Sequence, residues 1–179
     1  MNILIVGAST GLGRAFVEGL GKDGDTLVGV SRSKPLTLEM QSEAAVEWLE
    51  VDMSRPAEAA DTIAAQAPAN LDVIIYNLGV WEERAFEKDY NFLESSDEEI
   101  SHLIDVGVTA AMLVLKRLMP RLLKSNRPQI ILTGSTSALT QCGGVEVAFG
   151  ASKFALRGIA GALREGFRSE RLAVTCLQL

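Results

Sequence analysis

Residues 3–16, ILIVGASTGLGRAF, join an apolar run to a turn with three glycines and then to a helical pattern. Gly7, Gly11 and Gly13 follow the apolar run directly. Glycines at these places permit a tight turn, and they let backbone N–H groups approach a pyrophosphate at the start of a helix. The stretch therefore predicts a strand–turn–helix unit that binds a dinucleotide. The alternative is a turn whose glycines serve packing alone.

Apolar runs alternate with amphipathic stretches along the whole chain. The apolar runs are residues 3–6, 27–30, 46–51, 71–76, 130–132 and 172–177. Runs without polar alternation are typical of strands that are buried on both faces of a parallel sheet. Helical spacings follow several of these runs, and the longest covers residues 100–122. This order predicts one α/β domain over residues 1–179, with a Rossmann-like, doubly wound parallel sheet and helices on both faces.

The longest helical pattern has a clear start and a marked far end. Residues 96–99, Ser-Asp-Glu-Glu, have the form of a capping box, with acids at the positive end of the helix dipole. Pro120 is expected to bend or shorten the far end. The preceding residues 80–95, VWEERAFEKDYNFLES, show no period and are interpreted as a loop.

Composition excludes several classes of protein. The chain has 179 residues and a net charge of -6, which argues against a nucleic-acid partner. It has no run of 18 apolar residues and no basic, apolar leader at its start, so we expect neither a membrane span nor a signal peptide. Cys142 and Cys176 form no CxxC pair, so a disulfide or a metal site is not expected, and a cytoplasmic location follows.

The Gly-x-x-x-Gly-x-Gly spacing of residues 7–13 resembles the short-chain dehydrogenase/reductase family, and four other segments agree. Asp52, in LEVDMS, matches the acidic residue that contacts adenine in that family. The segment YNLG, residues 76–79, resembles its Asn-Asn-Ala-Gly segment, with Asn77 at the second Asn. GSTSA, residues 134–138, and FGASK, residues 149–153, lie where the family has its catalytic Ser segment and its Tyr-x-x-x-Lys motif.

The resemblance implies a dinucleotide site and indicates which cofactor it takes. The implied cofactor residues are Gly7, Ser9, Thr10, Gly11, Leu12, Gly13, Ser31, Arg32, Asp52, Met53, Asn77, Gly79 and Lys153. In GVSRSK, residues 29–34, Ser31 stands where a carboxylate would bind the adenosine ribose, and Arg32 and Lys34 follow. Because a guanidinium matches a phosphate, NADP(H) is favoured over NAD(H). The alternative is a solvated loop arginine.

The resemblance also implies four catalytic positions, and two of them are changed. Lys153 is present at the position that binds the nicotinamide ribose, and the alternative is an exposed helix lysine. The Ser position falls on Thr136, with Ser135 and Ser137 beside it; any of these can bond a carbonyl or be an ordinary strand-end hydroxyl. The proton-donating Tyr is replaced by Phe149, and the water-binding Asn is replaced by Gly107.

The loss of the tyrosine hydroxyl has a large expected cost. A general acid contributes about 10²–10⁴ in rate, or about 3–5.5 kcal/mol of barrier. Cys142, Tyr90 and His102 are conceivable substitutes, although His102 is expected to be solvated on the long helix and Cys142 reads as a small loop residue. The chain also stops after LAVTCLQL, residues 172–179, where the family continues into a substrate-covering loop.

Three hypotheses about function follow. The first is an NADP(H)-binding oxidoreductase that acts on a small carbonyl or alcohol substrate, with activity that is weak or of altered mechanism. The second is a non-catalytic dinucleotide-binding protein, a sensor or an interaction partner. The third is a truncated product without a stable cofactor site. The family pairs its two long helices with a second subunit, and Gly158, Gly161 and Gly166 lie on the second of them, so a homodimer or homotetramer is expected.

Overall fold

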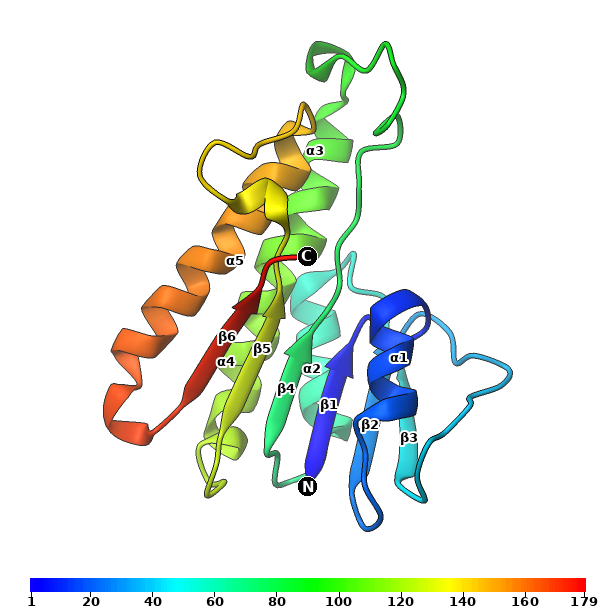
Figure 1. Cartoon of the computed structure of the whole chain (residues 1–179), viewed down its shortest axis with the longest axis vertical. Helices are drawn as coiled ribbons and strands as arrows, with labels where there is room; N and C mark the ends of the chain where they lie inside the picture. Colours follow the sequence, from blue (N-terminus) through cyan, green and yellow to red (C-terminus); the bar gives the residue numbers. More distant parts are fainter.

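The computed structural model describes all residues from Met1 to Leu179 and contains one parallel sheet of six strands (Figure 1). The strand order is β3-β2-β1-β4-β5-β6. The strands are β1 (Asn2–Val6), β2 (Thr26–Ser31), β3 (Ala45–Glu50), β4 (Val73–Tyr76), β5 (Gln129–Thr133) and β6 (Ala173–Leu177). All six lie within one or two residues of the predicted apolar runs, so the prediction of a doubly wound parallel sheet is confirmed.

Burial differs between the centre and the edges of the sheet. β4 is buried along its whole length, and so are β1 and β2 after their first residues. The edge strands β3 and β6 instead alternate between exposed and less exposed positions. The expectation that every apolar run is buried on both faces is therefore wrong for these two strands. Each edge strand has only one neighbour, which leaves part of its surface uncovered.

Helices cover both faces of the sheet. α1 (Gly11–Gly19) packs Val17 and Phe16 against the face that carries Ile3 and Ile5. α2 (Pro56–Gln66), α4 (Ala110–Leu122) and α5 (Val147–Gly166) contribute to the main core on the other face, a cluster of 28 buried residues. This arrangement places the start of α1 beside the carboxyl ends of the central strands (Figure 1).

The longest helical pattern is interrupted by a turn of π-helix. α3 (Asp97–Ile104) begins at Ser96, whose Oγ accepts a hydrogen bond from the N–H of Glu99 at 3.0 Å, as the predicted cap requires. The π-helical turn η2 (Asp105–Thr109) then leads into α4, which ends at Leu122, two residues after Pro120. Gly107 lies inside η2 and faces α5, where a Cβ would lie 3.0 Å from Cβ of Ser152. The missing side chain thus lets the two helices approach closely.

The remaining segments are short or irregular. Residues 80–95 form the predicted loop, apart from the 3-10 turn η1 (Phe92–Glu94). Two further 3-10 turns are η3 (Thr136–Ala138), after β5, and η4 (Arg168–Glu170), after α5. None of the helices combines the length and the apolar character needed to cross a bilayer.

Candidate functional site

The glycine-rich turn after β1 leaves the start of α1 open. Gly13 approaches the carbonyl oxygen of Gly7 so closely that a Cβ there would clash with it. Thr10 is the N-cap residue of α1, and its side chain makes no capping hydrogen bond. The first N–H groups of the helix are therefore free of side-chain acceptors. Such groups, at the positive end of the helix dipole, are suited to a phosphate.

A cleft of about 240 Å³ lies between this turn and the ends of the neighbouring strands. Its position is the point at which the strand order reverses, between β1 and β4, where doubly wound sheets bind ligands. Eight of the predicted cofactor residues line it: Gly7, Ser9, Thr10, Ser31, Arg32, Asp52, Met53 and Gly79. Gly11, Leu12 and Gly13 lie in the adjoining first turn of α1, and Asn77 and Lys153 line a second pocket.

The end of β2 presents one free cation to the cleft. Ser31 Oγ accepts a hydrogen bond from Trp48 Nε1 at 3.1 Å and donates to the carbonyl of Ser33 at 2.7 Å, so its hydroxyl is already used within the protein. Arg32 is exposed and forms no ion pair. The pKa of Asp52 is lowered, first by a hydrogen bond from the N–H of Ser54 and further by the charge of Arg32.

The second pocket, of about 230 Å³, shares Gly79 with the cleft. Its lining is Asn77, Gly79, Trp81, Gly134, Ser135, Phe149, Lys153 and Leu179. Lys153 is only 5% exposed, and its Nζ donates to the carbonyl of Thr133 at 3.0 Å. A Cβ on Gly79 would lie 2.7 Å from this Nζ. The ammonium therefore lies where the two hollows meet, and the interpretation of Lys153 as an exposed lysine is wrong.

Asn77 ties the two hollows together. Its Oδ1 accepts a hydrogen bond from Thr133 Oγ1 at 2.9 Å, and its Nδ2 donates to the carbonyl of Gly7 at 3.4 Å. It thus links the end of β5 to the glycine-rich turn.

Of the hydroxyls predicted for the Ser position, Ser135 lies in the pocket and Thr136 does not. Ser135 is buried, and its Oγ accepts a hydrogen bond from the N–H of Ser137 at 3.2 Å. Its own O–H donates to no protein atom, which leaves it available to a ligand. Thr136 is exposed and is the first residue of η3. Of the two hydroxyls predicted for the catalytic position, the structure therefore brings Ser135 to the pocket, while Thr136 lies outside its lining.

Phe149 lies between an aromatic ring and a cation. Its ring stacks on that of Trp81, with centroids 3.4 Å apart and planes 14° apart. Lys153 Nζ lies 5.5 Å from the centroid of the Phe149 ring. Neither Trp81 nor its partnership with Phe149 is predicted from the sequence, because Trp81 lies in a loop without periodicity.

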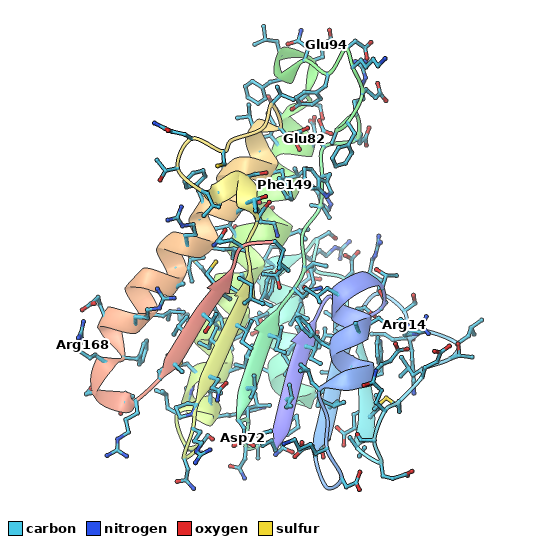
Figure 2. All side chains as sticks on the ribbon, in the orientation of Figure 1. Arg14, Asp72, Glu82, Glu94, Phe149 and Arg168 are labelled. Atoms are coloured by element: carbon cyan, nitrogen blue, oxygen red, sulfur yellow. The ribbon has the colours of Figure 1, made fainter.

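Glu82 is a second residue that the sequence analysis missed. It is only 3% exposed, and its Oε1 accepts hydrogen bonds from the N–H groups of Ala148 and Phe149 at 2.9 and 3.1 Å. Its Oε2 is buried without a hydrogen-bond partner. Figure 2 shows Glu82 close to Phe149, where the loop after β4 passes the start of α5. Glu82 is followed by Glu83 and Arg84 in a polar loop, so the sequence carries no signal that its side chain is buried.

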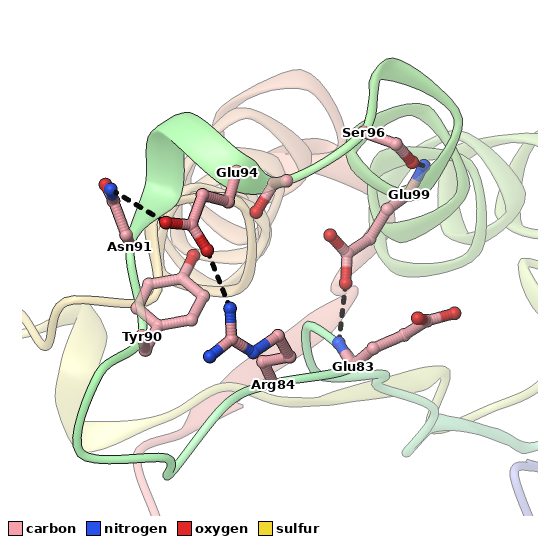
Figure 3. Close-up of a pocket in the computed structure, with 8 residues that line it drawn as sticks. Glu83, Arg84, Tyr90, Asn91, Glu94, Ser96 and Glu99 are labelled. Atoms are coloured by element: carbon pink, nitrogen blue, oxygen red, sulfur yellow. Dashed lines mark hydrogen bonds and ion pairs between the residues drawn. The ribbon is translucent and has the colours of Figure 1, made fainter.

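None of the three conceivable substitute acids lies in the pocket. Cys142 is exposed in the loop before α5, and His102 is exposed, as expected, and lines the dinucleotide cleft. Tyr90 lines a third hollow of about 150 Å³ formed by the loop after β4 (Figure 3). There Arg84 is paired with Glu87, Asp89 and Glu94, which raises its pKa, so its charge is committed to holding this loop.

Comparison with known proteins agrees with this geometry. The model of the short chain dehydrogenase family matches residues 1–179. An NADPH-dependent pterin aldehyde reductase of Arabidopsis thaliana is 31% identical over 169 residues, which are 90% of this chain and 66% of that protein. A short-chain type dehydrogenase/reductase of Sinorhizobium fredii is 26% identical over 161 residues, and the chain spans 61% of its length.

Solved structures show the same fold. A short-chain dehydrogenase from Sphingobium yanoikuyae in complex with NADPH has a TM-score of 0.82 and 25% identity, covering 98% of this chain and 68% of that one. An alcohol dehydrogenase from Thermococcus sibiricus, complexed with 5-hydroxy-NADP, has a TM-score of 0.81 and 20% identity, covering 99% of this chain and 74% of that one. The family match over the whole chain, joined to the strand order and the glycine-rich turn, shows that this protein belongs to the short-chain dehydrogenase family.

Proposed function

We propose that the protein binds NADP(H) and exchanges a hydride between the nicotinamide and a small carbonyl or alcohol substrate. The observation that carries this proposal is the junction at Gly79, where the cleft beside α1 meets the pocket that holds Ser135 and Lys153. One hollow suits the nucleotide half of a dinucleotide, and the other suits a nicotinamide with its substrate. The family to which the chain belongs supports an oxidoreductase.

The residues of the cleft fit a phosphorylated dinucleotide. The uncapped start of α1 offers N–H groups to the pyrophosphate, and the unpaired guanidinium of Arg32 offers bidentate bonds to a 2′-phosphate. Asp52 lies where an adenine amino group can be bound, and Lys153 offers N–H donors to the nicotinamide ribose. When bound, the nicotinamide supplies or accepts the hydride.

The pocket then orients the substrate. The free O–H of Ser135 donates to the carbonyl oxygen and stabilises the negative charge that develops on it during reduction. Phe149 contributes a packed ring but no proton. Two relatives are consistent with the choice of cofactor: the Arabidopsis reductase is named as NADPH-dependent, and the Sphingobium structure contains NADPH.

The cofactor preference is tested by binding. We expect NADPH to bind more tightly than NADH, because Arg32 lines the cleft and its guanidinium forms no ion pair within the protein. Calorimetry with both nucleotides, repeated on Arg32→Asp, should show that the ratio of the two dissociation constants falls by about tenfold or more, since a charge-assisted bond to phosphate contributes about 1.5–3 kcal/mol.

The control is Arg127→Asp, which makes the same charge change at an exposed site before β5 and should leave the ratio unchanged. Equal constants for the two nucleotides in the unchanged protein would contradict the NADP(H) preference. NADPH binding without turnover of any carbonyl would favour the non-catalytic hypothesis instead.

We also propose that the protein is a homodimer or homotetramer that pairs through α4 and α5. An apolar groove of about 410 Å³ runs between these helices, lined by Met112, Leu115, Lys116, Met119, Ile159, Ala162, Leu163 and Phe167. On α5, a Cβ at Gly158 or Gly161 would meet no other atom within 4 Å, so the surface there is open. A cytoplasmic location accompanies the proposal, because both cysteines are free thiols.

A further inference from the structure

The second pocket, which is lined by Ser135, Phe149 and Lys153, contains a single titratable side chain. Among the eight lining residues, only Lys153 carries a group that can gain or lose a proton in the ordinary pH range. Among the residues that line the pocket, Lys153 is therefore the one whose side chain can supply the proton that carbonyl reduction requires. This restriction arises because Phe149 has no hydroxyl and because Cys142, Tyr90 and His102 all lie outside the pocket.

The surroundings of Lys153 leave N–H groups free to act on a ligand. An ammonium has three N–H donors, and the only hydrogen bond of this one runs to the carbonyl of Thr133. No carboxylate forms an ion pair with it. The absence of a side chain on Gly79 gives Nζ its place at the junction with the dinucleotide cleft.

The charged and titratable groups around this ammonium are few. Cys176, on β6, interacts with it electrostatically, and Arg157 lies one helical turn further along α5, where it donates to the carbonyl of Ala138. The buried carboxylate of Glu82 is bound to the amides at the start of α5. Burial lowers the pKa of Lys153, a shift toward the range in which a lysine can give up a proton.

We propose that Lys153 is the general acid of this protein and delivers to the substrate oxygen the proton that a tyrosine would otherwise supply. The inference rests on the proposed function. With NADPH bound, the nicotinamide would supply the hydride that forms the new C–H bond at the carbonyl carbon as the C=O π bond breaks. The oxygen takes a proton from Lys153 Nζ, directly or through one water, and Ser135 holds that oxygen. The products are the alcohol, the oxidised cofactor and a neutral lysine, which water then reprotonates.

The direction of the pH dependence follows from this role. The reduction needs the protonated lysine. The rate is therefore highest below the pKa of Lys153 in the complex and falls as the pH rises through that pKa. Because burial places this pKa below that of a solvated lysine, the loss begins at a lower pH than it would for an exposed amine.

Two measurements test the proposal on the full chain. The first is the titration of the lysine side-chain ¹³Cε resonances by NMR, with the signal of Lys153 identified by its absence in Lys153→Arg. We expect Lys153 to titrate at lower pH than the five remaining lysines, such as the exposed Lys124. This readout needs neither cofactor nor substrate, so it stands even if the proposed function fails.

The second measurement compares variants in NADPH binding and in turnover of 4-nitrobenzaldehyde, cyclohexanone and menadione. Lys153→Arg keeps a cation with N–H donors for the ribose but holds its proton throughout the accessible pH range. We expect its dissociation constant for NADPH to lie within about threefold of that of the unchanged protein. Its kcat should fall by about a hundredfold or more, and the loss of rate at high pH should disappear. Lys124→Arg, the control, should change neither quantity.

Several results would overturn the proposal. One is a Lys153 signal that titrates together with the exposed lysines. Another is a Lys153→Arg variant that retains kcat and its pH profile. NADPH binding without turnover of any of the three carbonyls would also contradict it, because Lys153 would then be a ribose ligand only. Failure of NADPH to bind at all would instead contradict the proposed function, while the NMR titration would still report the pKa of Lys153.

Discussion

At the scale of single residues, Phe149 stands at the position that the family resemblance assigns to a catalytic tyrosine, and it lacks the hydroxyl of that residue. The Phe149 ring is 4% exposed and stacks on Trp81, and the ammonium of Lys153 lies 5.5 Å from the centroid of the ring. The packing contribution of an aromatic side chain is thus retained, since such stacked pairs stabilise by about 0.5–1.5 kcal/mol beyond area burial. The side chain lacks the hydroxyl, and the effect of restoring that hydroxyl can be tested directly.

Phe149→Tyr should raise turnover of a carbonyl with NADPH by about tenfold or more, because it returns a general acid to the pocket. NADPH affinity should change little, since the ring itself remains. Adding Gly107→Asn should not help further, because a Cβ at that position would lie 3.0 Å from Cβ of Ser152, a tight contact that requires the Ser152 side chain to give way. Steady-state kinetics and NADPH titration of both variants check this. Unchanged turnover in Phe149→Tyr would show that the missing phenol is not the limiting defect.

Glu82 gives a second prediction at this scale, and it concerns stability. Glu82→Ala leaves the buried N–H groups of Ala148 and Phe149 without an acceptor, and we expect the free energy of unfolding to fall by roughly 1–3 kcal/mol. Glu82→Gln keeps an oxygen acceptor and should cost less. The matched control is Glu83→Ala, an exposed neighbour. Urea denaturation measures the free energy of unfolding of all three variants. A Glu82→Ala variant as stable as the unchanged protein would refute the stabilising role of the Glu82 carboxylate.

The sequence was informative about some of these residues and silent about others, for a physical reason. The glycine-rich turn and Lys153 belong to local motifs, so spacing along the chain locates them. Ser31 reads as a cofactor residue, yet its hydroxyl is occupied by Trp48, a residue 17 positions away that only the pairing of β2 with β3 brings near. Glu82 meets α5 across a separation of 66 residues, which no local pattern encodes.

At the scale of elements, the pairing surface of α4 and α5 gives a prediction about assembly. Met112 lines the apolar groove and is 45% exposed, so a second subunit would bury it. Met112→Asp would place an unpaired charge in that interface, and we expect the molar mass by light scattering at micromolar concentration to fall toward that of a monomer.

Leu93→Asp is the control for that experiment. Leu93 is 86% exposed and lies in η1, far along the chain from either helix, so the same kind of change there should leave the mass unaltered. A monomeric mass for the unchanged protein, with its helical circular dichroism intact, would contradict the proposed assembly.

The interrupted helix shows where element prediction from sequence stops. The periodicity of residues 100–122 predicts one helix, and the cap at Ser96 is where the sequence places it. The π-helical turn at Asp105–Thr109, which includes the close approach of Gly107 to Ser152 of α5, is not visible in that periodicity. Turns of this kind occur often at functional sites, and this one includes Gly107, the position that the family resemblance assigns to an asparagine.

At the scale of the whole molecule, the order of strands and helices follows from the pattern of apolar runs. Strand–helix alternation and right-handed crossovers leave few arrangements, and the observed order β3-β2-β1-β4-β5-β6 is one of them. The runs alone do not distinguish edge strands from central ones, since both are rich in apolar residues. A strand is an edge strand when it pairs with only one other strand, and this pairing is fixed only in the assembled sheet.

The contact of Glu82 with the start of α5 also bears on how the molecule opens. The carboxylate joins a loop that follows β4 to the first turn of a helix 66 residues later, so neither segment can separate without leaving buried donors unpaired. The amides of Ala148 and Phe149 should therefore exchange with deuterium only when the loop unfolds as well, in one cooperative event. In Glu82→Ala those two amides should exchange at the faster rate of a fraying helix end, independently of the loop. Slow exchange that persists in this variant would mean that other contacts hold the two segments together.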